Sequence, residues 1–250
     1  VIHQPLRCLI QTTENQLNQC KDSVTAIILE PILQGAGGMQ VYSQDFLAKL
    51  AAFAKENDIH VIADEIMTGI GRTGKMLASQ HAKITPDFIC LSKGLTSGWM
   101  PFSAVLTTRN IYKAFYDDYE KGKSFLHSHT YSGNALGASV ALATLSIIKE
   151  ENFSNRANKL QTIMREHLND IANKTGALTN IRGIGAVVAA DLVNPKGTAR
   201  LGYLLYQEAL KLGALLRPLG NTIYWMPPLN IPIDTLHDLK RITLQAIRNL

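Results

Sequence analysis

Short apolar runs, separated by segments long enough to form a helix, constrain the fold of this chain most strongly. They lie at Ala26–Leu29, Ile59–Ala63, Phe88–Leu91 and Phe102–Leu106. Runs of this length are typical of strands that a sheet buries on both faces. Between the first two, apolar residues recur at helical spacing within Gln44–Glu56. This alternation predicts an α/β fold with a mainly parallel central sheet and helices on both of its faces.

The C-terminal part of the chain has a different pattern. Asn134–Lys149 is rich in alanine and leucine and predicts a buried helix, and Ser154–Asn173 predicts a long amphipathic helix. The tail then predicts a strand starting in Arg182–Gly185 and ending near Asp191, a helix over Ala199–Lys211, short strands around Arg217 and Tyr224, and a terminal helix. We therefore predict a large domain over residues 1–165 and a small α+β domain over residues 166–250.

Composition excludes several classes of protein. The chain has 250 residues, of which 46% are hydrophobic and 18% charged, enough to bury a sizeable core. Its net charge of +5 comes from scattered basic residues, so we expect no nucleic-acid partner, whereas small anionic molecules suit the surface. No apolar run approaches the roughly 20 residues that span a bilayer, and no signal-peptide pattern opens the chain. We expect no membrane partner and a cytoplasmic location. Because the chain opens at Val1, we also expect an upstream region to be missing.

Glycines in Gly69–Lys75 match the spacing of nucleotide-binding loops. A P-loop needs a hydroxyl after its lysine to bind magnesium, and Met76 stands there. A pyrophosphate would also approach Asp64 and Glu65, which would repel it. We therefore favour a structural role for these glycines, in a tight loop that passes beneath another segment.

An amine and a carboxylate follow two neighbouring strand candidates. Asp64 and Glu65 come directly after one apolar run, and Lys93 follows the next. Ligands of open α/β sheets bind at the carboxyl ends of the strands, so these groups are expected to converge. Apolar surroundings favour the neutral, nucleophilic form of an amine, which Schiff-base chemistry with a carbonyl requires. Taken singly, a lysine in the position of Lys93 is more often a solvated loop residue. An aspartate in the position of Asp64 is more often a helix cap or an ion-pair partner.

With these residues in place, the chain resembles the class III aminotransferases. The resemblance is carried by Val61–Ile66, Thr68–Gly74 and Pro86–Gly94, which are similar to the signature of that family. Glu30–Ile32 with its glycine loop, Thr130–Asn134 and Arg182–Gly185 also resemble family segments, in the family's order. The resemblance implies a fold type I transferase that depends on pyridoxal 5'-phosphate.

The same resemblance implies roles for individual residues. Lys93 would hold the cofactor as a Schiff base and move protons during the reaction, and Asp64 would keep the pyridine nitrogen protonated. Thr130, with the backbone near Ser128 and His129, would bind the cofactor phosphate of the neighbouring subunit, which implies a homodimer with shared active sites. We expect no metal site, because His127 and His129 lack a third ligand at sensible spacing.

Within the family, the chain most resembles members that aminate 8-amino-7-oxononanoate in biotin biosynthesis, with S-adenosylmethionine as the expected donor. Its Glu30–Gly38 loop lacks the second carboxylate of ornithine-type relatives, and Tyr224 stands where those relatives carry an arginine. Arg217 resembles the arginine that receives the distal carboxylate of the acceptor, where a guanidinium can form two hydrogen bonds. Ser128 and Lys93 are the other expected substrate-binding residues.

Some positions depart from the family pattern. Met67 stands where many relatives have a glutamine, and Ser128-His129 replaces the usual Gly-Pro before the threonine. The family's phosphate cup and aromatic walls come from the region upstream of Val1. Two alternatives therefore stay open: a class III aminotransferase for another ω-amine or diamine, and an inactive remnant or fragment that serves as a dimerisation scaffold.

Overall fold

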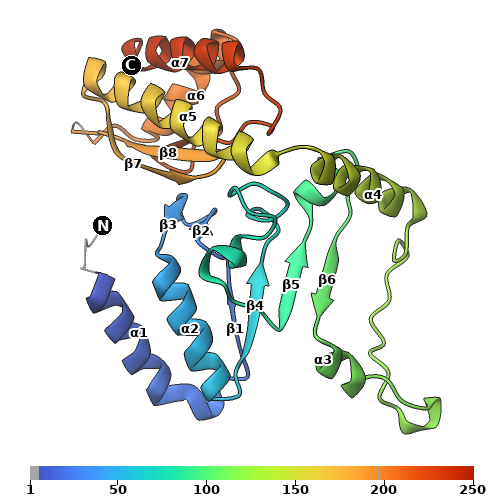
Figure 1. Ribbon diagram of the computed structural model, residues 1–250. Helices are drawn as coiled ribbons and strands as arrows, with labels where there is room; N and C mark the ends of the chain where they lie inside the picture. The colour runs from blue at the N-terminus through green and yellow to red at the C-terminus, as the bar shows by residue number, and fades with distance from the viewer. Residues whose placement is uncertain (1–5, 196) are drawn as a thin grey trace. The chain divides into compact units, whose positions relative to one another are not determined.

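The computed structural model describes residues 6–195 and 197–250, which form two compact units (Figure 1). Unit 1 contains the chain up to Ile32, with Tyr42–Met67 and Ala78–Ile147. Unit 2 contains Leu33–Val41, Thr68–Leu77 and Ile148–Leu250. The predicted domain boundary after residue 165 falls inside helix α5, which spans Phe153–Thr175. The assignment of the units to a cofactor-binding and a small domain stays a prediction.

Unit 1 is built on a four-stranded sheet in the order β1-β4-β5-β6. The strands span Ala26–Leu29, His60–Asp64, Phe88–Leu91 and Ala104–Thr107. The pairs β1–β4 and β4–β5 are parallel and β5–β6 is antiparallel, so the expected mainly parallel α/β sheet is confirmed. Each strand overlaps one of the apolar runs seen in the sequence.

The helices of unit 1 are α1 (Leu6–Cys20), α2 (Gln44–Glu56), α3 (Arg109–Ala114) and α4 (Ala135–Glu150). Helix α2 begins where Ser43 Oγ accepts a hydrogen bond from Phe46 N at 3.0 Å, a typical N-cap. Ala54 at its end and Val61 on β4 belong to one buried apolar cluster. Helix α2 therefore packs against the sheet as predicted, whereas α1 was not predicted because its sequence is polar.

The expectation of a buried helix over 134–149 is wrong for the part of the chain that the structure describes. Helix α4 forms, but only Gly137, Ala141 and Thr144 are buried along it. Leu136 and Leu142 are 69% and 67% exposed. The alanine- and leucine-rich composition thus predicted the helix correctly. It did not indicate which faces of the helix would be exposed in the described part of the chain.

Unit 2 contains an antiparallel sheet in the order β7-β8-β9, spanning Leu178–Ile184, Val187–Leu192 and Thr222–Trp225. The single strand predicted between Arg182 and Asp191 is in fact a hairpin, because Gly185 has a φ of +56° and reverses the chain there. The strand expected around Arg217 is also wrong, since that residue lies outside any strand or helix. A two-stranded ribbon, β2 (Leu33–Gln34) and β3 (Gln40–Val41), completes the strands described in unit 2.

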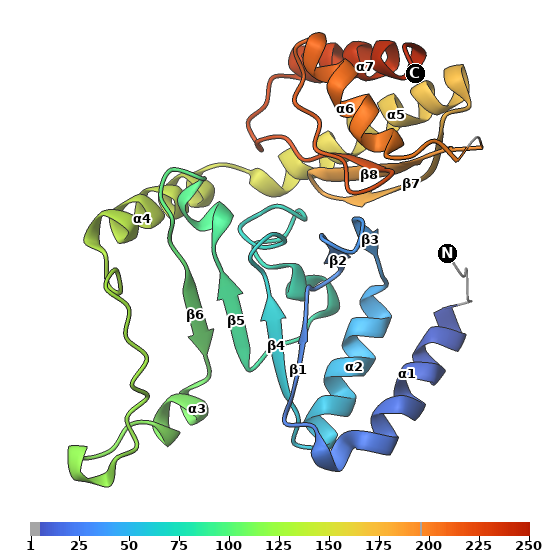
Figure 2. The same ribbon diagram turned by 180° about the vertical axis from the view of Figure 1, so that it is seen from behind.

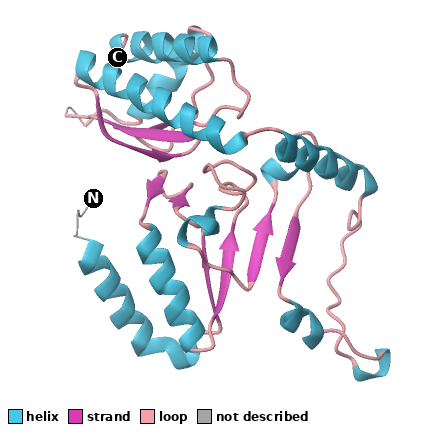
Figure 3. Ribbon diagram, viewed as in Figure 1, coloured by secondary structure: helices cyan, strands magenta, loops and turns pink. Residues whose placement is uncertain are grey.

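Helices α5, α6 (Leu201–Lys211) and α7 (Ile233–Arg248) pack on one side of the β7-β8-β9 sheet (Figures 1 and 2). Their core includes Leu160, Met164, Leu205, Trp225 and Leu236, each at most 2% exposed. The predicted small α+β arrangement is visible in the distribution of helices and strands (Figure 3). No described helix is both long and apolar enough to cross a bilayer.

Candidate active site

Asp64 and Lys93 lie at the same edge of the unit 1 sheet. Asp64 is the last residue of β4, and its partner across the parallel pairing is Cys90 on β5. Lys93 follows three positions later and opens a 3-10 turn, Lys93–Thr96. Because parallel strands end at a common edge, this pairing brings the carboxylate and the amine to neighbouring positions, as the sequence predicted.

The segment that carries Lys93 is anchored on both sides. Ser92 Oγ donates to Phe102 O at 2.8 Å, and Thr96 Oγ1 donates to Met100 O at 2.6 Å. Lys93 itself has a φ of +36°, a conformation that costs energy outside glycine. Its side chain is exposed, and no hydrogen bond or ion pair joins its amine to a described residue. A strained backbone thus presents an amine that is unpaired within the described chain.

The two adjacent carboxylates at the end of β4 have different surroundings. Glu65 is 1% exposed and accepts hydrogen bonds from the backbone N–H groups of Ala78 and Ser79, both at 2.8 Å. Asp64 is half-buried, and its Oδ1 accepts from Ile66 N at 3.0 Å. Glu65 therefore holds the returning chain in place. Asp64 keeps an oxygen, Oδ2, for which the described residues provide no donor.

The charge of Asp64 is felt by its neighbour on β5. Burial raises the pKa of the Cys90 thiol, and the negative charge of Asp64 raises it further. The second effect agrees with the pairing of Asp64 and Cys90 at the end of β4. An ionised carboxylate at this edge is suited to stabilise a cationic group of a ligand.

The segment expected to bind the phosphate is exposed throughout. His129 Nδ1 accepts a hydrogen bond from Tyr131 N at 3.2 Å, and Ser132 N donates to His129 O at 2.9 Å. These bonds form a local turn before α4. No hydrogen bond or ion pair in the described structure joins Ser128, His129 or Thr130 to Lys93 or Asp64. Within this chain, their role in the site thus stays a prediction.

The glycine-rich loop at 69–75 belongs to unit 2 and packs against the β7–β8 hairpin. Arg72 Nη1 donates to Pro227 O at 2.6 Å, and Ala186 N donates to Arg72 O at 2.9 Å. Burial lowers the pKa of the Arg72 guanidinium. A Cβ on Gly71 would lie 2.8 Å from the ring of Phe153. The loop therefore fits tightly under its neighbours, which is the structural role that we favoured.

Arg182 fixes the other glycine-rich loop of unit 2. Its guanidinium donates to Met39 O at 3.1 Å and to Gly38 O at 2.5 Å, and it forms an ion pair with Asp191 at 2.8 Å. Although burial opposes it, hydrogen bonding led by that from Arg182 lowers the pKa of Asp191. Sequence reasoning treated Arg182 only as part of a family segment. Its anchoring role could not be found from the sequence, because the partners lie 143 and 144 positions away.

Arg217 lies in unit 2, in a hollow of about 500 Å³ that Arg200 and Tyr203 also line. Its side chain is exposed. Tyr224, which stands where ornithine-type relatives have an arginine, is half-buried on β9 opposite Ala189. The expected carboxylate receptor is therefore open to ligands, but its part in a reaction stays a prediction.

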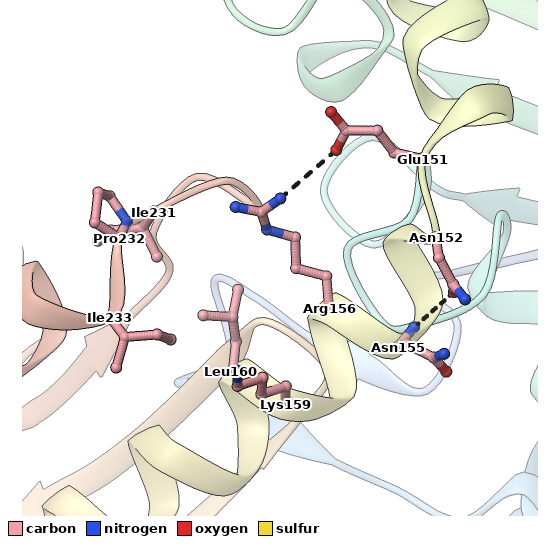
Figure 4. A pocket seen from close by; sticks show the side chains of 9 residues that line it. All are labelled: Glu151, Asn152, Asn155, Arg156, Lys159, Leu160, Ile231, Pro232 and Ile233. Carbon is pink, nitrogen blue, oxygen red and sulfur yellow. Dashed lines mark hydrogen bonds and ion pairs between the residues drawn. The ribbon is translucent and has the colours of Figure 1, made fainter.

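Another hollow of unit 2, of about 620 Å³, lies between the first turns of α5 and the Ile231–Ile233 segment (Figure 4). Glu151 forms an ion pair with Arg156 at 3.7 Å, and Asn152 Oδ1 accepts from Asn155 N at 3.2 Å. These polar groups bind one another, and none of the predicted site residues lines this hollow.

Comparisons with known proteins decide the family. The sequence model of class III aminotransferases matches residues 3–247. The chain belongs to the class III aminotransferase family. The predicted family is therefore confirmed, and membership implies pyridoxal 5'-phosphate as the cofactor. The sheet edge with Asp64 and Lys93 is accordingly the candidate active site of a class III aminotransferase.

Several relatives of this class III chain carry one name. The adenosylmethionine-8-amino-7-oxononanoate aminotransferase of Helicobacter pylori is 42% identical over 234 residues, covering 86% of this chain and 51% of the relative. That of Geobacter sulfurreducens is 36% identical over 238 residues, covering 92% and 52%. The chain thus spans about half the length of the curated relatives it matches.

Solved structures confirm the class III fold. The crystal structure of adenosylmethionine-8-amino-7-oxononanoate aminotransferase from Methanocaldococcus jannaschii has a TM-score of 0.89 and 34% identity, covering 96% of this chain and 57% of that one. A thermostable omega transaminase from Pseudomonas jessenii also reaches a TM-score of 0.89, at 29% identity, covering 98% and 55%. The expected fold type I transferase architecture is therefore confirmed.

Proposed function

We propose that this chain forms part of an aminotransferase that moves an amino group from S-adenosylmethionine to 8-amino-7-oxononanoate. The observation that carries the proposal is the shared sheet edge of Asp64 and Lys93, where an amine and a carboxylate oxygen both lack partners among the described residues. The names of the relatives support this acceptor and donor. A homodimer with shared active sites and a cytoplasmic location remain predictions.

The donor set at this edge fits pyridoxal phosphate chemically. The amine at this edge suits its aldehyde, and the carboxylate suits its protonated ring nitrogen. The hydroxyl and amide donors expected from Thr130 and its neighbours would suit its phosphate. When bound, this cofactor supplies an aldehyde that condenses with amines and a ring that accepts the electrons released at the substrate Cα. The protein must then supply binding groups and proton transfer.

Each residue has a task that follows from its chemistry. Lys93 would hold the aldehyde of the cofactor through Nζ, and as a free amine it could take up or return the proton at the substrate Cα. Asp64 holds a proton on the ring nitrogen through its carboxylate. Thr130, with Ser128 and His129, binds the phosphate of the partner subunit's site. Arg217 binds the carboxylate of the acceptor in a bidentate manner.

Absorbance spectroscopy with added pyridoxal phosphate tests the proposal. A Schiff base with Lys93 should give a band at roughly 410–430 nm, on the covalent chemistry assumed. Borohydride reduction should then fix the cofactor mass on the peptide that contains Lys93. Lys93→Ala should lose both signals, whereas Lys55→Ala, an exposed lysine in the last turn of α2, should keep them.

The full-length protein should give the same outcome. Absence of the band from that protein, or labelling that survives Lys93→Ala, would overturn the proposal.

A second candidate is amino transfer to an uncharged carbonyl acceptor that gives another ω-amine or diamine, favoured by the likeness to omega transaminases. Arg217→Gln separates the two. If the acceptor is the oxononanoate, this change should raise its KM by about 10-fold or more, because a charge-assisted pair is lost. Turnover of a neutral carbonyl acceptor should hardly change. Equal losses for both acceptors would favour the second candidate.

A further inference from the structure

The hollow around Arg217 contains a second arginine, Arg200. It measures about 500 Å³, and its walls include Arg200, Tyr203, Tyr206, Leu215, Arg217 and Pro218. All of these residues belong to unit 2. The hollow therefore combines two guanidinium groups with a mainly apolar surface.

Neither guanidinium is neutralised within the described chain. Arg156, Arg182 and Arg241 each form an ion pair with a carboxylate. In contrast, no carboxylate lines the hollow, and the structure gives Arg200 and Arg217 no ion pair among the described residues. Two unpaired cations in one hollow raise the local positive potential, which favours an anionic ligand.

The position of Arg200 is set by an aromatic ring. Its Cζ lies 4.3 Å from the centroid of the Tyr203 ring, a cation–π contact that favours this position of the exposed guanidinium. Tyr203 and Tyr206 lie in turn at a centroid distance of 5.8 Å. Arg200 is thus directed by the first turn of α6 rather than left as a free surface side chain.

The first turn of α6 is packed closely against the segment that follows Arg217. Gly202 approaches the carbonyl of Gly220 so closely that an added Cβ would collide with it. Gly202 N also donates to Asn221 Oδ1 at 3.4 Å. This close approach keeps Arg200 and Arg217 on adjoining parts of the same hollow.

The apolar part of the hollow sets the kind of anion. Leu215 is 74% exposed, and Tyr206 and Pro218 add apolar surface beside it. Contact between this surface and a hydrocarbon chain buries apolar area, which favours binding. An inorganic ion has no apolar part that could make this contact. The combination therefore fits a carboxylate at the end of an aliphatic chain.

We propose that Arg200 is a second carboxylate-binding residue, which shares with Arg217 the acid group of an acceptor that ends in an aliphatic carboxylate. Tyr203 is its positioning residue. The inference rests on the proposed function in so far as Arg217 is taken as the carboxylate receptor. It adds a second guanidinium, that of Arg200, to the one that the proposed function assigns to the acid group.

Binding of octanoate, measured by isothermal titration calorimetry at low salt, tests this inference without cofactor. Arg200→Gln should weaken octanoate binding about 5-fold, because a charge-assisted contact at a partly solvated site is lost. Octanamide has the same chain but no charge, and its binding should not change. Arg248→Gln removes an equal charge at the exposed end of α7 and serves as the matched control.

Tyrosine variants separate positioning from general structure. Tyr203→Phe keeps the ring and should bind octanoate like the parent chain. Tyr203→Leu should lose about as much affinity as Arg200→Gln, and the two changes combined should lose little more, since they remove the same contact. In the active enzyme, Arg200→Gln should raise the KM of the oxononanoate with kcat nearly unchanged.

The inference is overturned if Arg217→Gln abolishes octanoate binding while Arg200→Gln leaves it unchanged. It is also overturned if Arg200→Gln and Arg248→Gln have equal effects, or if octanamide responds like octanoate. The calorimetry needs no cofactor. Absence of the absorbance band would therefore contradict the proposed function without affecting the octanoate result.

Discussion

Asp64 and Cys90 are direct neighbours across the parallel strands β4 and β5, and burial together with the charge of Asp64 raises the pKa of the Cys90 thiol. Asp64→Asn removes the charge and keeps an oxygen that can accept from Ile66 N. We expect the pKa of Cys90 to fall, although burial will keep it above the ordinary value. The pH dependence of iodoacetamide alkylation, with Cys8 and Cys20 replaced by serine, measures this.

The control for the thiol measurement is Asp45→Asn in the first turn of α2, which should leave the alkylation curve in place. An unchanged curve for Asp64→Asn would mean that the carboxylate does not act on the thiol.

The same substitution has a consequence for catalysis. Asp64→Asn should lower kcat for amino transfer by about 100-fold, because the ring nitrogen loses the carboxylate that holds its proton. Cofactor binding, followed by absorbance, should weaken far less than the rate. Activity close to that of the parent enzyme would show that another group holds this proton.

Arg182 should be a major source of stability in unit 2. Its side chain is 9% exposed and pairs with Asp191, so Arg182→Met leaves a partly buried carboxylate without its cation, although Thr222 and Asn180 still donate to it, and removes one donor each from Gly38 O and Met39 O. We expect a loss of about 3–5 kcal/mol in the free energy of unfolding, measured by urea denaturation. Arg241→Gln breaks an exposed ion pair with Asp238 and should cost at most about 0.5 kcal/mol. Similar losses for both variants would contradict the anchoring role.

The histidine pair between α5 and α7 should make stability depend on pH. His167 Nε2 and His237 Nδ1 lie 3.0 Å apart, a hydrogen bond that requires one ring to stay neutral. Burial lowers the pKa of His167, and the charges of Lys240 and His237 lower it further. Below the ordinary value of about 6.5, the unfolded chain therefore binds more protons than the folded one.

The contribution of this histidine to the free energy of unfolding should therefore be fully present above that pH and should decrease as the pH falls below it. Thermal melts at pH 7.5 and 5.5 measure the difference. His167→Gln can still bind His237 but does not titrate, so it should reduce the pH dependence. A parent protein whose melting temperature is equal at both pH values would contradict this expectation.

Gly185 should tolerate no side chain. It has a φ of +56°, and an added Cβ would lie 2.5 Å from Arg72 O. Gly176, with a φ of +63° and nothing within 4 Å, provides a matched control. Gly176→Ala should cost about 1 kcal/mol from backbone strain alone. Gly185→Ala should cost clearly more, and equal melting temperatures for the two variants would disprove the close contact.

Local patterns in the sequence predicted the regular elements well. Helix α2 has the predicted bounds, and each strand of the unit 1 sheet overlaps an apolar run, because burial and helical periodicity are local signals. The hairpin at Gly185 was missed because two short strands and one glycine read as a single strand. The exposure of Leu136 and Leu142 was missed because composition does not show which face a neighbour covers.

The candidate site was predictable for a different reason. Asp64 and Lys93 each follow an apolar run, so topology alone brings them to one sheet edge. The different roles of Asp64 and Glu65 were not predictable, since the donors to Glu65 come from Ala78 and Ser79, 13 and 14 positions away. Arg200 likewise carried no signal, because its partner ring and its hollow exist only once α6 has packed.

Arg182 and Arg72 bond residues that lie far away along the chain, so truncation of the protein would remove some of these contacts. Leu33–Val41 and Thr68–Leu77 belong to the same unit as Ile148–Leu250, although unit 1 residues separate them along the chain. In a fragment that begins at Ile148, the Arg182 guanidinium would lack the carbonyls of Gly38 and Met39 as acceptors. The β7–β8 hairpin would also lose its contact with Arg72. Residues 148–250 therefore depend on two earlier loops for some of their native contacts.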